Sequence, residues 1–183
     1  MSSKTEYLDI LDENGVSTGL SEERNIVHRE GLWHRAIIVA IVNDNNEVLI
    51  QKRAKTKDKY PGLWDISVAG HVPSGHDSVS CAAMETMEEI GYLLKKSVQV
   101  KDFRFLTSFR NQLSISEGFI ENQYYDFFVY NANVDIKDFK LQKEEVSDVK
   151  YVSPYEIKVM AEKGLLHPRT EWVKVLYNYM TRF

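Results

Sequence analysis

The chain has 183 residues, of which 43% are hydrophobic, and a formal net charge of −4. This size and composition suit one domain with a substantial core, and the acidic balance argues against a general nucleic-acid-binding surface. Cys81 is the one cysteine, which excludes an internal disulfide and fits a reducing cytoplasm. The N-terminal residues contain no apolar signal core, and no apolar run approaches a membrane span. We therefore expect a cytoplasmic protein that does not bind a membrane.

The first 34 residues predict a hairpin followed by a short helix. Asn14-Gly15 is a strong hairpin turn, so a short strand is expected on each side, the first over residues 6–11. A helix should open at Ser21, run to about residue 30 and end at Gly31. His28 and His34 lie close to its exit, where a histidine is usually packed or solvent-facing rather than a ligand.

Two strands should form the middle of the sheet. The β-branched apolar run in residues 35–43 predicts a strand that is buried on both faces. Residues 44–46 form a turn, and residues 47–53 return with either Val48 and Ile50 or Leu49 and Gln51 inward. Residues 63–69 alternate between larger apolar and smaller or polar side chains, which is typical of a half-buried strand.

The loop of residues 54–59 follows Lys52-Arg53 and is the most basic stretch of the chain. Such a loop is usually a solvated surface. The alternative is a diphosphate cradle, in which Arg53 contacts phosphate oxygens through charged hydrogen bonds. Its position just before an acidic helix favours the second interpretation.

Residues 77–91 predict that helix, with a capping residue at its start and a glycine at its end. Its apolar stripe comprises Val79, Ala82, Ala83, Met87 and Ile90. Cys81 is expected to be a small buried residue. Glu85, Glu88 and Glu89 stand off the stripe at i, i+3 and i+4, so their charges repel unless a cation lies among them. The three are either a solvated acidic face or a site for a hard divalent cation.

The second half of the chain predicts further strands and two helices. Strands are expected over residues 98–100, 103–109, 119–132 and 146–152, with a loop near the substrate over residues 111–118. Ser153 and Glu156 form a capping box for the first helix. The final helix begins after Thr170, and its apolar face should pack on the sheet or on a second subunit in a homodimer. The later acids that can add a metal ligand or a base are Glu121, Glu144, Glu145 and Asp148, although surface charge is the commoner role of the last three.

Residues 70–92 resemble the signature of Nudix hydrolases, G-x5-E-x7-R-E-U-x-E-E-x-G-U, in which U is aliphatic. The positions that match in register are Gly70, Glu85, Glu88, Glu89 and Gly91. His76 and Met84 stand where the first glutamate and the arginine are expected, and Thr86 and Tyr92 are atypical at the aliphatic positions. The resemblance implies a Nudix fold and a metal site formed by the three glutamates with the carbonyl of Ala69.

Shorter matches over residues 6–130 resemble the subgroup that includes isopentenyl-diphosphate isomerase. They are Leu32-Trp33-His34-Arg35-Ala36, Gln51-Lys52-Arg53-Ala54, residues 60–71 and Glu121-Asn122-Gln123. In that enzyme the positions of His34, His71 and Glu121 ligate metal, and those of Arg53 and Lys57 hold the diphosphate.

The chemistry of the isomerase is not supported by the same matches. Isomerisation uses a cysteine just before the box glycine and a second glutamate after Glu-Asn, and this chain has Ala69 and Gln123 there. An alanine can neither donate nor accept the protons that isomerisation moves, and a neutral amide is a poor base. The resemblance therefore favours hydrolysis over isomerisation.

The whole sequence predicts a single α/β domain over residues 1–183, with a mixed β-sheet sandwiched between α-helices. Residues 1–34 form the N-terminal hairpin and helix, residues 35–152 the core, and residues 153–183 the C-terminal helices. The expected function is hydrolysis, dependent on Mg²⁺ or Mn²⁺, of a diphosphate bond in an organic pyrophosphate such as a nucleoside diphosphate derivative. The alternatives are an isopentenyl-diphosphate isomerase-like enzyme and a catalytically weak diphosphate-binding domain.

The expected catalytic residues are Glu85, Glu88, Glu89 and Glu121. The expected metal ligands are the first three of these and Ala69. The expected contacts to the small-molecule diphosphate are Arg53, Lys57 and His71. Either Glu89 or Glu121 is expected to take the proton of the attacking water.

Overall fold

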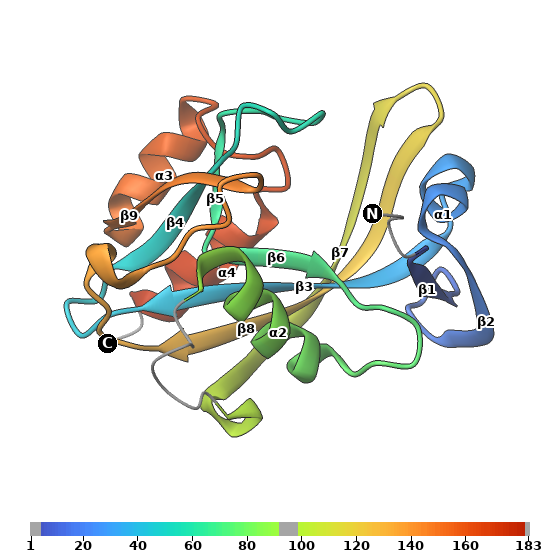
Figure 1. The fold of residues 1–183 in the computed structure, drawn as a ribbon, viewed down its shortest axis with the longest axis horizontal. Coiled ribbons are helices and arrows are strands. Elements are labelled where there is room, and N and C mark those ends of the chain that lie inside the picture. Colours follow the sequence, from blue (N-terminus) through green and yellow to red (C-terminus); the bar gives the residue numbers. More distant parts are fainter. Residues whose placement is uncertain (1–4, 92–98, 182–183) are drawn as a thin grey trace.

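A computed structural model of the protein describes residues 5–91 and 99–181, and within these residues nine strands form one sheet (Figure 1). The strands are β1 (Tyr7–Leu11), β2 (Ser17–Glu23), β3 (Trp33–Val42), β4 (Val48–Arg53), β5 (Trp64–Ile66), β6 (Val68–His71), β7 (Phe103–Ser116), β8 (Phe119–Asn131) and β9 (Val146–Val152). The α-helices are α1 (Arg24–Glu30), α2 (Ser78–Ile90), α3 (Pro154–Glu162) and α4 (Glu171–Met180). None of the described helices is both long and apolar enough to cross a membrane.

β3 is the strand around which the sheet is arranged. It runs parallel to β8 from the His34–Gln123 pair to the Val42–Asn131 pair. Along its other edge β1, β6 and β4 follow one another, all antiparallel to it. One parallel pair among antiparallel neighbours makes the sheet mixed, as the sequence predicts.

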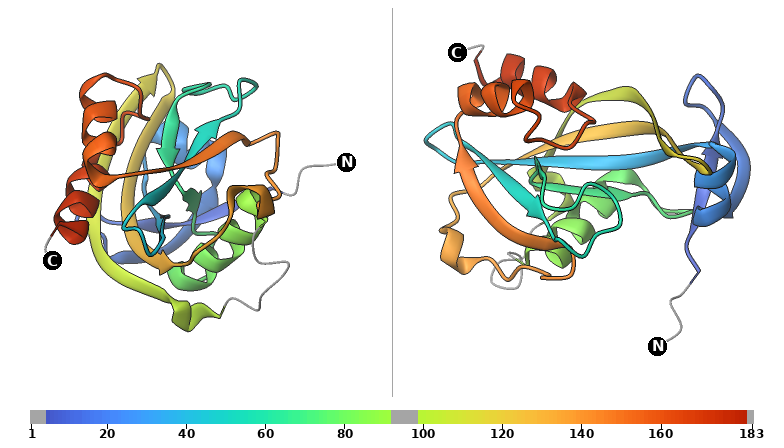
Figure 2. Two further views of the ribbon diagram at one scale, coloured as in Figure 1. Left: turned by 90° about the vertical axis from the view of Figure 1, so that its left-hand side faces the viewer. Right: turned by 90° about the horizontal axis from the view of Figure 1, so that it is seen from above.

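Helices cover both faces of the sheet, with α2 on one side and α3 and α4 on the other (Figure 2). Alternate residues of β3 serve the two cores: Ile38 packs in the cluster with α3 and α4, and Ile37 packs in the cluster with α2. The prediction that this strand is buried on both faces is confirmed. Trp172 and Leu176 of α4 belong to the first cluster, so the apolar face of the final helix packs on the sheet. A homodimer stays a prediction.

β4 resolves the choice of register in an unexpected way, because both of its faces are buried. Val48 and Ile50 join the core under α3 and α4, whereas Leu49 joins the core under α2. Gln51 is buried as well, and its amide donates a hydrogen bond to Glu89 Oε2 at 3.0 Å. The strand therefore connects the core directly to the acidic helix.

The N-terminal segment forms the predicted hairpin, but its helix begins later than predicted. Asp9 pairs with Ser21 and Tyr7 pairs with Glu23, so residues 21–23 complete β2. The helix α1 starts only at Arg24 and ends at Gly31, whose φ of 64° is the left-handed conformation expected of a terminating glycine. Strand pairing thus overrides the helix-start signal at Ser21.

The half-buried strand predicted over residues 63–69 is wrong in two respects. It is divided into β5 and β6 at Ser67, and both Ser67 and Asp65 are fully buried. The Ser67 hydroxyl donates to the Leu49 carbonyl and accepts the Ile41 N–H at 2.8 Å, so it links β4 to β3. These polar side chains are buried because each has a hydrogen-bond partner from another part of the chain.

The loop predicted over residues 111–118 is also wrong. Residues 111–116 continue β7 and pair with β8 as far as Ser116, and the hairpin turns only around Gly118, where φ is 74°. The partner strand supplies the backbone hydrogen bonds that the polar sequence did not predict. Of the strand predicted over residues 98–100, Val98 lies outside the described residues and Val100 begins a 3₁₀ turn.

α2 forms largely as predicted. Asp77 caps it by accepting the Ser80 N–H at 2.9 Å, and Gly91 ends it with φ at 59°. Its buried residues are Cys81, Ala82, Thr86 and Ile90, so the buried character of the cysteine is confirmed. Met87 is 44% exposed, and its place in the apolar stripe is therefore wrong. Thr86 takes a buried position because its hydroxyl donates to the Ala82 carbonyl at 2.6 Å.

Candidate functional site

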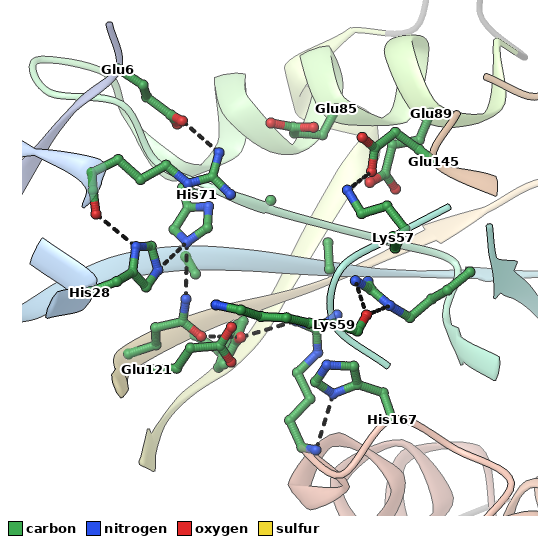
Figure 3. Close-up of a pocket in the computed structure, with 18 of the residues that line it drawn as sticks. Glu6, His28, Lys57, Lys59, His71, Glu85, Glu89, Glu121, Glu145 and His167 are labelled. Atoms are coloured by element: carbon green, nitrogen blue, oxygen red, sulfur yellow. Dashed lines mark hydrogen bonds and ion pairs between the residues drawn. The ribbon is translucent and has the colours of Figure 1, made fainter. Parts of the chain in front are cut away.

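A pocket of about 760 Å³ opens between α2, β6, β8 and the loop after β4 (Figure 3). Every predicted site residue lines it: Arg53, Lys57, Ala69, His71, Glu85, Glu88, Glu89 and Glu121. It is also lined by residues that the sequence did not single out for the site, among them Glu6, Arg24, Lys59, His167 and Arg169. His76 is exposed and lies off the pocket lining, whereas Met84 lies on it. The structure thus brings the predicted residues together around one space.

Glu85, Glu88 and Glu89, here called the acidic cluster, form the wall contributed by α2. Burial, followed by repulsion from Glu88, raises the pKa of Glu85 to about 7. Burial and the charge of Glu85 raise the pKa of Glu89 to about 8, although hydrogen bonds from Gln51 and the Ala69 backbone oppose the change. When no cation balances such a cluster, some of its carboxyl groups stay protonated at neutral pH.

Gly70 explains how Glu85 reaches the pocket. A Cβ atom added at Gly70 would lie 2.5 Å from Cδ of Glu85, which is closer than any contact between these atoms allows. The carboxyl group of Glu85 therefore occupies the space that a side chain at Gly70 would take. A glycine at this position of β6 is needed for the close approach.

Basic side chains from the loop after β4 form the facing wall. Lys57 makes an ion pair with Glu145, which comes from the loop before β9. Arg53 donates from Nε and Nη2 to the Lys59 carbonyl, at 3.2 and 3.0 Å, and so holds the loop in place. Burial lowers the pKa of Lys59 to about 8, against the opposing charge of Glu121. Lys57 and Lys59 thus both present ammonium groups to the pocket (Figure 3).

His28, His34 and His71, here called the histidine cluster, meet at the wall of the pocket that His28 and His71 line, with ligand atoms within 4.8 Å of one another. Nδ1 of His28 faces the Arg24 carbonyl at 2.7 Å, and Nδ1 of His34 faces the Leu32 carbonyl at 3.0 Å. A carbonyl can only accept, so each Nδ1 carries the proton and each Nε2 presents a lone pair. Burial lowers the pKa of all three imidazoles, which are therefore neutral.

The histidine cluster has the donor atoms for a metal ion, but an amide already contacts it. Nε2 of Gln123 lies 3.1 Å from Nε2 of His34 and 3.1 Å from Nε2 of His71. The Tyr125 hydroxyl donates to Oε1 of Gln123, which fixes the orientation of the amide. A metal ion can bind to these histidines only if Gln123 moves.

A buried ion pair supports this arrangement from behind. Arg169 pairs with Asp65, and its Nη1 also donates to the Tyr125 hydroxyl at 3.1 Å. Next to it, burial raises the pKa of Glu121, while the charges of Arg169 and Lys59 lower it. Oε2 of Glu121 is buried and makes no hydrogen bond within the described part of the chain. Because Asp65, Tyr125 and Arg169 are far apart in the sequence, no local pattern could have revealed this network.

Comparison with known proteins shows which family the sequence matches. Residues 32–174 match the family model of the NUDIX domain. Nudix hydrolase 3 of Arabidopsis thaliana is 42% identical over 82% of the chain, but the match spans only 19% of that relative's length. The isopentenyl-diphosphate Delta-isomerase of Streptomyces coelicolor is 30% identical over 82% of the chain and 72% of its own length.

A solved structure supports the fold independently. The crystal structure of DR0079 from Deinococcus radiodurans has a TM-score of 0.72, covering 94% of this chain and 99% of its own, at 19% sequence identity. At this identity the similarity concerns the fold.

Proposed function

This chain belongs to the Nudix family, and we propose that it hydrolyses the diphosphate bond of a small organic pyrophosphate with the help of Mg²⁺ or Mn²⁺. The observation that carries the proposal is the acidic cluster itself. Glu85 and Glu89 have carboxyl groups with raised pKa values in a pocket whose other wall carries lysines. A carboxyl-rich wall facing ammonium groups suits a substrate that is anionic and metal-bound.

The residues present fit a hard divalent ion. Carboxylate and carbonyl oxygens are the ligands that Mg²⁺ prefers, and the acidic cluster with the Ala69 carbonyl offers such a set. An ion there would also favour the ionised forms of Glu85 and Glu89, whose pKa values are raised by burial and by neighbouring carboxyl groups. When bound, such an ion supplies Lewis-acid polarisation of a phosphoryl oxygen and acidifies a water molecule.

The chain's own groups have distinct parts in this proposal. Lys57 and the remaining donor capacity of Arg53 neutralise phosphate charge as it moves toward the leaving oxygen. His71, neutral and at the base of the pocket, donates or accepts a hydrogen bond with the substrate. A pocket carboxylate takes the proton of the attacking water, and the sequence suggests Glu89 or Glu121 for this role.

Isomerisation of isopentenyl diphosphate is the second candidate, favoured by the identity to the Streptomyces enzyme. The residues of the site do not favour isomerisation. Ala69 offers the pocket no proton-transfer group, and the Gln123 amide is neutral and held by Tyr125 and the histidine cluster. A silent diphosphate-binding domain is the third candidate, because Met84 stands on the pocket lining where the family has an arginine.

A panel of diphosphate compounds separates the three candidates. The purified protein is incubated with Mg²⁺ and nucleoside diphosphate derivatives or isopentenyl diphosphate, and products are identified by phosphorus magnetic resonance. We expect cleaved phosphate products that require Mg²⁺, and loss of most of this activity in Glu89→Gln. The matched control is Glu144→Gln, since Glu144 is an exposed glutamate off the pocket lining. An alkene isomer that keeps both phosphates, or saturable binding without turnover, would contradict the proposal.

A further inference from the structure

We infer that Glu145 is the carboxylate that accepts the proton of the attacking water, and that Lys57 releases it for this task by moving from Glu145 to the diphosphate. The inference rests on the proposed hydrolase function and assigns a residue within the same pocket. Glu145 lies in the loop before β9, outside the family signature, and forms an ion pair with Lys57. It takes the role for which the sequence suggests Glu89 or Glu121.

The backbone holds Glu145 in a defined place at the pocket wall. Its carbonyl accepts the Ala54 N–H at 2.8 Å, and its own N–H donates to the Gln142 carbonyl at 2.9 Å. Gln142 in turn donates its N–H to the Glu89 carbonyl at 3.1 Å, at the end of α2. The loop is therefore tied both to the acidic helix and to the start of the basic loop. Because the backbone is held by these hydrogen bonds, the Glu145 side chain starts from a fixed position at the pocket wall.

Glu145 lies beside the acidic cluster. Figure 3 shows the carboxyl groups of Glu89 and Glu145 close together, with the ammonium group of Lys57 against Glu145. Glu145 therefore faces the same space as the proposed metal ligands without being on their helix.

The other two candidates suit proton transfer less well. Glu89 is a proposed metal ligand, so its lone pairs are committed when the site is occupied. Glu121 lies beside Lys59, on the other side of the pocket from Glu85 and Glu89 (Figure 3). It is therefore farther than Glu145 from the proposed metal ligands.

Lys57 is the partner that can be exchanged. The ion pair is partly solvated, with 29% of the Lys57 side chain and 36% of the Glu145 side chain exposed, so it is held weakly. A diphosphate offers the ammonium group several charged oxygens in place of one carboxylate. Substrate binding then leaves the Glu145 carboxyl group without its lysine partner, on the side of the pocket where Glu89 lies.

The chemical step follows from this exchange. The water oxygen forms a bond to one phosphorus as the bond from that phosphorus to the bridging oxygen breaks, and the bridging oxygen leaves with the bonding electrons on the other phosphate. One proton of the water passes to the Glu145 carboxylate, and it then goes to the leaving phosphate or to solvent. No oxidant or second reactant is needed.

Steady-state kinetics of the whole protein with Mg²⁺ test the assignment. We expect Glu145→Gln to lower kcat about a hundredfold or more with little change in KM. Formate is expected to restore part of the rate in Glu145→Ala, which a purely structural residue would not allow. Lys57→Met is expected to raise KM, because the bound diphosphate loses a partner, and to lower kcat less than Glu145→Gln does. Glu144→Gln, the exposed neighbour, is the matched control and should behave as the wild type.

Manganese titration separates a base from a ligand. Glu145→Gln is expected to bind Mn²⁺ as tightly as the wild type. A tenfold weaker Mn²⁺ affinity in this variant would make Glu145 a ligand and overturn the inference. So would a kcat above half the wild-type value, or a Lys57→Met variant that loses kcat at unchanged KM. A wild-type protein that cleaves none of the diphosphates would instead refute the proposed function, and this inference with it.

Discussion

Binding of a divalent ion to the acidic cluster should release protons, and their number follows from the structure. In the metal-free protein at pH 7, Glu85 with a pKa of about 7 is half protonated, and Glu89 with a pKa of about 8 is mostly protonated. Ligand carboxylates must be ionised, so metal binding expels these protons. We expect between about one and two protons per chain at pH 7, and close to none at pH 9, which lies above both pKa values.

Calorimetric titration with Mn²⁺ measures this number, if it is repeated in two buffers with different ionisation enthalpies. The assay also tells the acidic cluster from the histidine cluster. His34 has a pKa of about 4 and that of His71 lies well below 6.5, so metal binding there expels no proton at pH 7. Tight Mn²⁺ binding without proton release at pH 7, or with the same release at pH 9, would refute the placement of the ion among Glu85, Glu88 and Glu89.

Three further perturbations test other parts of the account. Gly70→Ala should push the Glu85 carboxyl group out of place and lower kcat at least about tenfold, while the melting temperature changes little. An unchanged kcat in this variant would contradict the close approach of Glu85 to Gly70. Arg169→Met leaves the fully buried Asp65 without its ion-pair partner, so the free energy of unfolding, measured by urea titration, should fall by about 3–5 kcal/mol. A loss below about 1 kcal/mol would contradict the contribution of this ion pair to stability. The histidine cluster has folded-state pKa values below the ordinary 6.5, so the unfolded chain binds protons that the native chain excludes, and the contribution of these histidines to stability should fall as the pH is lowered from about 6.5 to 4. The raised pKa values of Glu85 and Glu89 give the opposite trend, so the test compares the wild type with His34→Gln: the variant should lose less stability over this pH range, and an identical pH dependence would refute the reasoning.

The parts of the structure that the sequence predicts are those with local signals. The helix α2 is one of them, because Asp77 can cap it, Gly91 can end it, and its glutamates recur at helical spacing. The β3 strand is another, since a long apolar run rich in β-branched residues is typical of a strand covered on both faces. The eight candidate site residues lie around one pocket because the signature and the shorter matches are each tied to such an element.

The parts that the sequence does not predict depend on contacts between distant segments. Residues 111–116, most of them polar, form a strand because β8 pairs with them. Asp65 looks like the exposed side of an alternating strand until Arg169, more than a hundred residues later, is placed against it. Glu145 looks like ordinary surface charge until the loop before β9 folds against Glu89 and Lys57. Such residues have no periodicity, cap or turn signal that distinguishes them from solvated neighbours.

Hydrolysis in ¹⁸O-labelled water is the most direct test of the claim that the acidic cluster, with a divalent ion, cleaves a diphosphate bond. With Mg²⁺ and a nucleoside diphosphate derivative, the account predicts one labelled oxygen in one of the two phosphate products, and loss of that product in Glu89→Gln. An intact diphosphate after incubation with every compound, or an isomerised alkenyl diphosphate without label, would contradict it.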